Sequence, residues 1–157
     1  MAEILLITPQ EITDTTILGG NVDVDKYKFC ILDTQVRVIE PLLGTLLYKY
    51  ILTNRATLTG EYLTLFNDYV KPILKFSTVA NYLEIASFMV DNGGIFKHTA
   101  ENKDIPSMQE VTALVQKYNS LCDMYILRFD KWNGKNNIPE YGRCQNPKIS
   151  TKIGWRL

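Results

Sequence analysis

The chain has 157 residues, 46% of them hydrophobic, so it can form one sizeable core and is short for two domains. Its 17 basic and 17 acidic residues give a net charge of zero, which excludes a bulk attraction to nucleic acid or acidic membranes. Its 3 cysteines lack a CxxC spacing, which argues against a disulfide framework or zinc knuckle. No apolar stretch reaches the roughly 18 residues that span a bilayer, and no secretory signal is recognisable, so we expect a cytoplasmic origin.

The first predicted helix begins at Thr8-Pro9-Gln10-Glu11. These residues combine a hydroxyl N-cap, a proline at the first helical position and a glutamate that can reach back to the cap amide. The helix is expected to run to about Leu18. Gly19-Gly20-Asn21 then ends it, because glycine readily adopts the left-handed conformation that closes helices.

A longer helical pattern follows over residues 24–53, with Asp23 as its N-cap. Pro41 lies inside this pattern, where it removes a helical hydrogen bond and clashes with the preceding turn. We therefore predict a kink or a break near Glu40, giving two helices in sequence or one bent helix. The pattern is apolar on more than one side. One stripe contains Val24, Tyr27, Ile31, Val38 and Leu42, and the other contains Phe29, Leu32, Val36 and Ile39.

A third helical region is predicted from Thr59 or Gly60 to about Val90, with a second kink at Pro72. The sequence Asp91-Asn92-Gly93-Gly94 is expected to stop it. Residues 95–106 are polar and aperiodic, which predicts a loop with at most a short extended piece at Ile95-Phe96.

The clearest pattern in the chain follows a second capping box, Ser107-Met108-Gln109-Glu110. Seven residues repeat at steps of three and four, which places them on one face of a helix of about six turns. A core-facing helix is favoured over a coiled coil because tyrosines occupy the stripe. The seven residues are Met108, Val111, Val115, Tyr118, Cys122, Tyr125 and Phe129.

The character of the chain changes at Trp132, after which glycine, proline and asparagine interrupt every helical pattern. Residues 132–157 carry 5 basic and 1 acidic side chains (5 − 1 = +4), whereas residues 1–131 carry 12 and 16 (12 − 16 = −4). We divide the chain into a helical domain, 1–131, and an extended basic arm, 132–157. The arm either folds back on its own domain or orders on a neighbouring subunit. Its segment 148–155 is compatible with a short strand.

The arm supplies the candidate interface residues, because buried aromatic and arginine side chains commonly dominate protein interfaces. They are Arg143, Lys148, Ile149, Lys152, Ile153, Trp155, Arg156 and Leu157.

The usual sequence marks of catalysis are missing. His98, the single histidine, is expected to be solvated in a polar loop. No nucleophile elbow, zincin, phosphate-loop or dinucleotide motif occurs. Asp23-Val24-Asp25 resembles the start of a calcium loop, but Lys28 and Thr34 occupy its sixth and twelfth positions, where glycine and glutamate are required. We predict no catalytic residue, no cofactor and no metal site, and expect that the protein is not an enzyme.

The order of these parts resembles a family of phage proteins. The parts are ITPQEI, then ILDTQVRVIEPLLGTLLYKYI, then YVKPIL, then DNGGIFKHTAENKDIPS, and finally YILRFDKWN with IPEY. Together they resemble the head-tail connector proteins (head-completion or adaptor proteins) of tailed bacteriophages, as in crAss-like phages. The resemblance covers roughly residues 4–141.

The resemblance implies an all-α bundle of about four to five helices, with kinked long helices and an extended C-terminal arm. It implies a structural virion protein of the phage neck that forms a ring, of twelve copies, beneath the portal. Such a ring joins head to tail and extends the DNA channel. Its partners are other copies of itself, the portal protein, other neck or tail proteins, and genomic DNA that passes without sequence recognition. No membrane is involved. The implied location is the virion, and the host cytoplasm during viral assembly.

Two other functions remain open at the level of sequence. The first is a nucleic-acid-binding module for DNA packaging that uses the basic C-terminal tail, whose affinity would fall steeply with salt. The second is an enzyme whose site leaves no recognisable motif.

Overall fold

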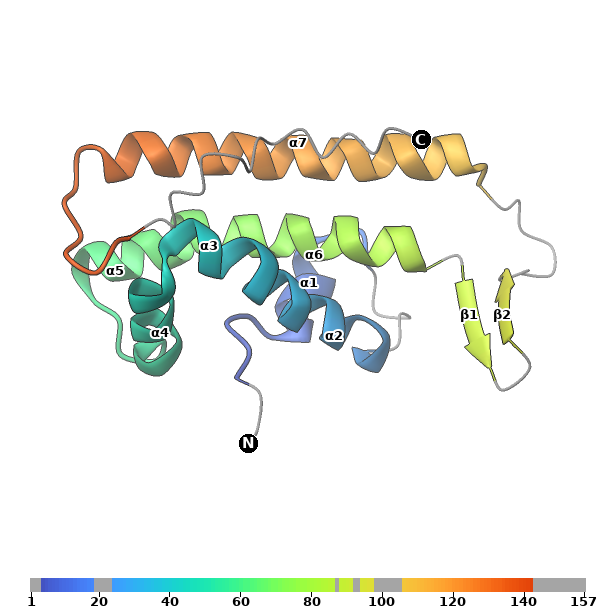
Figure 1. Ribbon diagram of the computed structural model, residues 1–157, viewed down its shortest axis with the longest axis horizontal. Helices are drawn as coiled ribbons and strands as arrows, with labels where there is room; N and C mark the ends of the chain where they lie inside the picture. Colours follow the sequence, from blue (N-terminus) through green and yellow to red (C-terminus); the bar gives the residue numbers. More distant parts are fainter. Residues whose placement is uncertain (1–3, 19–23, 87, 92–93, 98–105, 143–157) are drawn as a thin grey trace.

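The computed structural model describes residues 4–18, 24–86, 88–91, 94–97 and 106–142 (Figure 1). Within these residues the fold is mostly helical, with 5 continuous helical rods, so the predicted class and helix number are confirmed. The first three rods are α1 (Pro9–Thr15), then α2 (Val24–Thr34) with η1 (Gln35–Ile39) and α3 (Glu40–Leu43), then α4 (Thr45–Asn54). The other two are α5 (Gly60–Leu65) with η2 (Phe66–Val70) and α6 (Lys71–Ile85), and finally α7 (Met108–Asn133).

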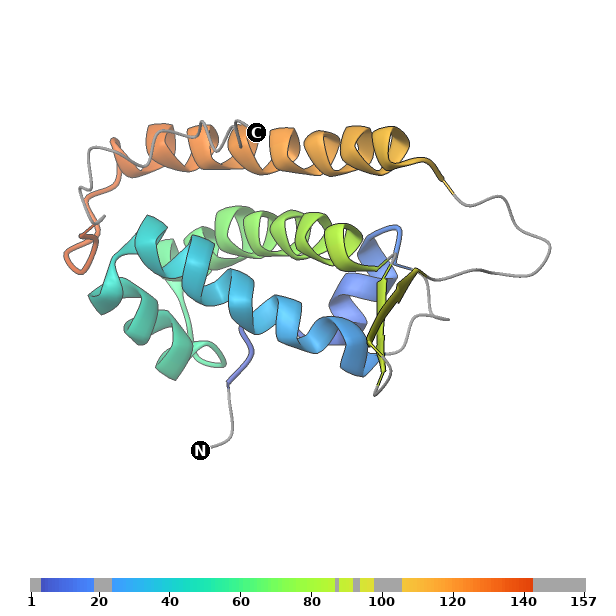
Figure 2. The ribbon, with the colours of Figure 1, turned by 45° about the vertical axis from the view of Figure 1, so that its right-hand side comes forward.

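The rods stack in layers, with α6 between α2 on one side and α7 on the other (Figures 1 and 2). Aromatic rings fill much of the α6–α7 contact. The ring of Phe76 lies 5.7 Å from that of Tyr125, and in η2, just before α6, the ring of Tyr69 lies 5.3 Å from that of Trp132. Burying such large side chains is the main source of stability for a helix pair of this length.

Both predicted capping boxes are present. The Thr8 hydroxyl accepts a hydrogen bond from the Glu11 N–H at 3.2 Å, and Ser107 does the same for Glu110 at 3.2 Å. In each capping box the glutamate carboxylate in turn accepts a hydrogen bond from the N–H of the cap residue. The helix starts are therefore fixed locally, as the sequence predicts. The first helix ends at Thr15, three residues before the predicted end.

Neither Pro41 nor Pro72 breaks its helix. A five-residue π-helical segment precedes each one, η1 before Pro41 and η2 before Pro72. The Glu40 N–H bonds the Gln35 carbonyl, and the Lys71 N–H bonds the Phe66 carbonyl, so both bonds reach back five residues. This wider turn keeps the backbone hydrogen-bonded around a residue that has no N–H.

The break in the second helical region lies at Gly44, four residues after Glu40, near which we predicted a kink or a break. Gly44 has φ 81° and ψ 152°, a conformation that ends α3 and redirects the chain into α4. Only glycine adopts this backbone region readily. The predicted outcome of two helices in sequence is confirmed, but a glycine causes it.

The third helical region ends at Ile85, and its predicted last turn is a strand. β1 (Phe88–Asp91) pairs antiparallel with β2 (Gly94–Lys97), with Phe88 opposite Lys97 and Asp91 opposite Gly94. The predicted extended piece at Ile95-Phe96 is part of β2. The sequence signal for this hairpin was present, because Asn-Gly between runs of β-branched and aromatic residues is a strong hairpin motif.

The apolar stripe of α7 faces the core as predicted, except at its first residue. Val115, Tyr118, Cys122 and Phe129 are buried, whereas Val111 and Tyr125 are partly buried. Met108 is 68% exposed. The first turn of α7 is therefore only partly covered.

The N-terminal segment is held by one buried amide. Gln35 in η1 accepts a hydrogen bond from the Leu6 N–H at 2.6 Å and donates one to the Ile4 carbonyl at 3.1 Å. These bonds satisfy backbone groups of a segment that belongs to no helix or strand.

Candidate assembly surfaces

All eight residues that we predicted for the interface lie outside the described residues, since the description ends at Gly142. They are Arg143, Lys148, Ile149, Lys152, Ile153, Trp155, Arg156 and Leu157. His98 also lies outside them, so the expectation that it is solvated stays a prediction. The structure does describe residues 132–142, the first part of the predicted arm. Trp132 and Asn133 are the last two residues of α7, so the helix runs past the predicted start of the arm.

The root of the arm, residues 138–142, is fixed to the end of the bundle formed by α3, α4 and α5. Ile138 is buried, and the ring of Tyr141 packs edge-on against Phe129 at 5.6 Å. The Gly142 N–H donates a hydrogen bond to the Leu43 carbonyl at 3.3 Å. These contacts set the position from which the following residues start.

A side-chain pair adds to this attachment. The Tyr62 hydroxyl donates a hydrogen bond to the Glu140 carboxylate, with 2.5 Å between the two oxygens. This bond, with a smaller contribution from desolvation, raises the pKa of Tyr62 to about 12. The Tyr50 ring lies 4.7 Å from the Tyr62 ring. Side chains from α4, α5 and the root of the arm are thereby brought into contact.

Gly44 makes the closest approach at this root. A Cβ atom placed on Gly44 would lie 2.0 Å from the Gly142 carbonyl oxygen, far inside any contact distance. The α3–α4 break thus serves two purposes, because the same glycine turns the chain and admits the backbone of residue 142. Sequence reasoning did not single out Gly44, and it predicted for Gly142 only that it interrupts the helical pattern after Trp132.

The side of α2 that carries the second predicted apolar stripe is only partly buried. Ile39 is inside the core, but Phe29 is 53% exposed, Val36 is 56% exposed and Leu32 is partly exposed. Phe29 and Leu32 lie in α2 and Val36 in η1, which continues the same rod, and their spacing of three and four residues places them on one face. An ion pair between Arg37 and Asp33, 2.6 Å apart, lies next to them in sequence. We call these three apolar residues the α2 stripe.

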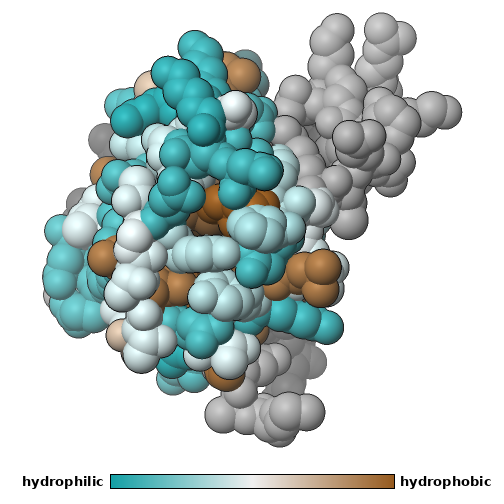
Figure 3. Space-filling model, turned by 90° about the vertical axis from the view of Figure 1, so that its left-hand side faces the viewer, coloured by the Kyte–Doolittle hydropathy of each residue, from teal (hydrophilic) through white to brown (hydrophobic). Residues whose placement is uncertain are grey.

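Apolar groups are also visible at the end of the bundle formed by α4 and α5. There they stand singly among polar ones (Figure 3). Leu46, Tyr50 and Leu63 contribute exposed side chains on these two helices. Scattered apolar residues are ordinary on protein surfaces, so this end is weaker evidence for a binding surface than the α2 stripe.

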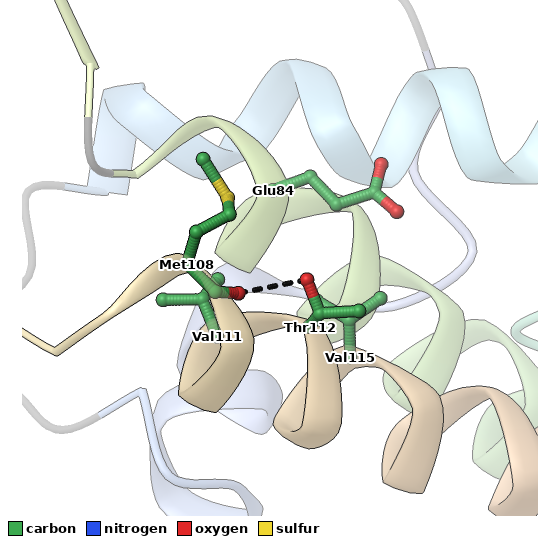
Figure 4. A pocket seen from close by; sticks show the side chains of 5 residues that line it. All are labelled: Glu84, Met108, Val111, Thr112 and Val115. Atoms are coloured by element: carbon green, nitrogen blue, oxygen red, sulfur yellow. Dashed lines mark hydrogen bonds between the residues drawn. The ribbon is translucent and has the colours of Figure 1, made fainter. Parts of the chain in front are cut away.

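A groove lies near the opposite end, between the end of α6 and the start of α7 (Figure 4). It has a volume of about 250 Å³ and is lined by Glu84 from α6 and by Met108, Val111, Thr112 and Val115 from α7. Its lining is mostly apolar. The Thr112 hydroxyl is occupied by a hydrogen bond of 2.8 Å to the Met108 carbonyl.

Two kinds of chemical site are not found among the described residues: a metal-binding cluster and a reactive thiol. No three His, Cys, Asp or Glu side chains among them are placed to hold a metal ion. Burial raises the pKa of the Cys30 and Cys122 thiols to about 11, so both stay protonated at neutral pH and are poor nucleophiles. Among the described helices, none is long and apolar enough to cross a membrane.

The comparison with known proteins identifies one family. Its model matches residues 39–151, from the end of η1 into the C-terminal segment, and its description is a family of unknown function (DUF6712). No curated protein and no solved structure matches the chain significantly.

Proposed function

The chain belongs to the DUF6712 family of unknown function, and we propose that it is a structural subunit of a ring in a tailed-phage neck. In this proposal the ring lies beneath the portal, joins head to tail and extends the DNA channel. The observation that carries the proposal is the α2 stripe. It is an apolar helix face that the described residues of the subunit leave open.

The α2 stripe leaves a considerable apolar surface exposed to water. Phe29 and Val36 are each more than half exposed, at 53% and 56%, although the opposite side of α2 packs in the core. Full burial of one such side chain contributes about 1.5–3 kcal/mol. One exposed apolar residue needs no explanation, but a row along one helix face is typical of a surface that another protein covers. Another copy of the chain is the occupant that a ring supplies.

The neck location, the twelve-fold ring, the portal and the passing DNA come from the resemblance to head-tail connectors. The surfaces support a role in binding. The described residues hold no metal-binding cluster, and both of their cysteine thiols have a raised pKa. We therefore propose a non-enzymatic virion protein that is free in the host cytoplasm before assembly.

The test is the assembly state of the full-length protein, measured by light scattering after size-exclusion chromatography and by electron microscopy. The wild type should form rings, alone or with a portal. Phe29→Glu/Val36→Glu should form no rings while keeping its helical circular dichroism. The matched control is Leu46→Glu/Leu127→Glu, which makes the same change at two exposed positions outside the stripe. The control should still assemble.

Two results would count against the proposal. A wild-type protein that stays monomeric and binds no portal would refute the ring. Salt-dependent binding to duplex DNA that disappears on removal of residues 142–157, without any assembly, would favour the DNA-packaging module instead.

A further inference from the structure

We propose that the groove between α6 and α7 receives the C-terminal segment, residues 143–157, of a neighbouring copy. This inference rests on the proposed ring and specifies the contact that joins one subunit to the next.

The groove suits an apolar anchor side chain. Its volume is about 250 Å³, whereas a cavity of roughly 150 Å³ already holds benzene in a well-studied case. Val111 and Val115 form its apolar wall on α7, and Met108, 68% exposed, borders it with a flexible side chain (Figure 4). Methionine adapts well to varied apolar partners. Glu84 adds a carboxylate across from them on α6.

The sequence of the C-terminal segment matches this groove. Residues 143–157 contain four basic and no acidic side chains, which complements Glu84 and a body of net charge −4 (12 − 16 for residues 1–131). From residue 148 onward, apolar and basic residues also alternate. In an extended chain, alternate side chains point to opposite sides. One side would present Ile149, Thr151, Ile153, Trp155 and Leu157, and the other Lys148, Ser150, Lys152, Gly154 and Arg156.

The C-terminal segment and the groove lie at opposite ends of the subunit, which favours a chain of subunits. The segment starts at Gly142, which is fixed at the α3–α4 break, whereas the groove lies at the other end of α7, beside the β-hairpin (Figure 1). The 26 residues of α7 make that helix about 39 Å long. When the segment of one copy binds the groove of the next, the copies are joined head to tail. Such a heterologous contact closes into a ring when the rotation between copies is suitable.

The segment can also reach the groove of its own subunit. Its thirteen residues from Arg143 to Trp155 span at most roughly 45 Å when fully extended. The experiment must therefore separate a contact between copies from a contact within one copy.

A complementation experiment with two full-length variants makes this separation. The arm variant is Ile153→Asp/Trp155→Asp, and the groove variant is Met108→Lys/Thr112→Lys, which changes two exposed positions. Neither variant alone should form rings. When both variants also carry Phe29→Glu/Val36→Glu, so that the α2 stripe adds no contact, each alone should be monomeric. Their mixture should form a dimer with one copy of each, because the arm variant supplies the only intact groove and the groove variant the only intact segment. Light scattering measures the mass of this dimer directly.

Two further measurements complete the test. A labelled peptide of residues 143–157 should bind the arm variant, and its affinity should fall at least about tenfold when the groove substitutions are added. The control for the groove variant is Ala113→Lys/Gln116→Lys, which adds the same charge to exposed positions of α7 outside the groove. That control should assemble like the wild type.

The outcomes distinguish this inference from the proposed function. If the groove variant forms rings like the wild type, the groove contact is refuted and the ring stands. If the mixture yields no dimer although the wild type forms rings, the segment does not bind the groove of another copy and the inference fails. If the wild type forms no ring, the proposed function fails, and peptide binding to the groove alone does not rescue it.

Discussion

Gly44→Ala tests the attachment of the C-terminal root to the bundle. The new Cβ would lie 2.0 Å from the Gly142 carbonyl oxygen, and this atom belongs to backbone, so no side-chain rotation relieves the overlap. The segment ending at Gly142 must move away by more than an ångström. The hydrogen bond of 3.3 Å from the Gly142 N–H to the Leu43 carbonyl would then be lost.

The expected cost has two parts. At φ 81° and ψ 152°, a residue other than glycine is strained by about 1–3 kcal/mol. The lost hydrogen bond adds about 1 kcal/mol. The sum is about 2–4 kcal/mol, which for a chain of this size lowers the Tm by roughly 10 °C. The loss is large compared with a typical stability of about 5–15 kcal/mol.

Urea unfolding followed by circular dichroism measures this loss, and two glycines provide matched controls. Gly60 also has a positive φ, 57°, but its Cβ would meet no atom within 4 Å, so Gly60→Ala should cost only about 1–2 kcal/mol of strain. A Cβ on Gly142 likewise meets nothing within 4 Å, and Gly142→Ala should be nearly neutral. If Gly44→Ala costs no more than Gly60→Ala, the close contact between residues 44 and 142 is refuted.

Three further predictions concern hydrogen bonds. Because the bond to Glu140 raises the pKa of Tyr62 from 10.0 to about 12, its contribution to stability is complete below pH 10 and is lost as the pH rises to 12. Urea unfolding at graded pH should show this additional decline in the free energy of unfolding in the wild type and not in Tyr62→Phe. Within the described structure the buried Thr78 hydroxyl has no partner, so Thr78→Val should raise the free energy of unfolding by about 1 kcal/mol, and an unchanged or lower value would contradict this. Gln35→Leu leaves the Leu6 N–H without its acceptor and should lower the free energy of unfolding by about 2 kcal/mol; no loss would show that water replaces the amide.

The local features of the fold could be predicted because they depend on neighbours in sequence. The capping boxes at Thr8 and Ser107 need only three residues each, and both form as predicted. The stripe of α7 follows from helical spacing alone. The mostly helical class follows from several such patterns taken together.

The proline positions show where local reasoning was too simple. Pro41 and Pro72 each lack the N–H of a helical hydrogen bond, which predicts a kink or break. The residue before each proline instead bonds a carbonyl five residues back, in a π-helical turn, and the helix continues. The real break lies at Gly44, where a positive φ is required. The end of the third helix was misplaced because Phe88 and Val90 fit a helical pattern and a strand pattern equally well.

Some of the candidate surfaces could also be predicted from the sequence, and one could not. The α2 stripe could be predicted as a second apolar side of its helix, and the basic C-terminal segment from charge alone. The groove at Met108 could not be predicted, since it depends on how far α6 extends beside α7.

By itself the sequence determined the helix starts, the apolar faces and the opposite charges of body and tail, because each arises from residues close together in the chain. Only the tertiary structure decided which apolar face is covered and where the chain leaves the bundle. Burial and the close approach of Gly142 to Gly44 depend on segments that are distant in sequence and meet only in the folded protein.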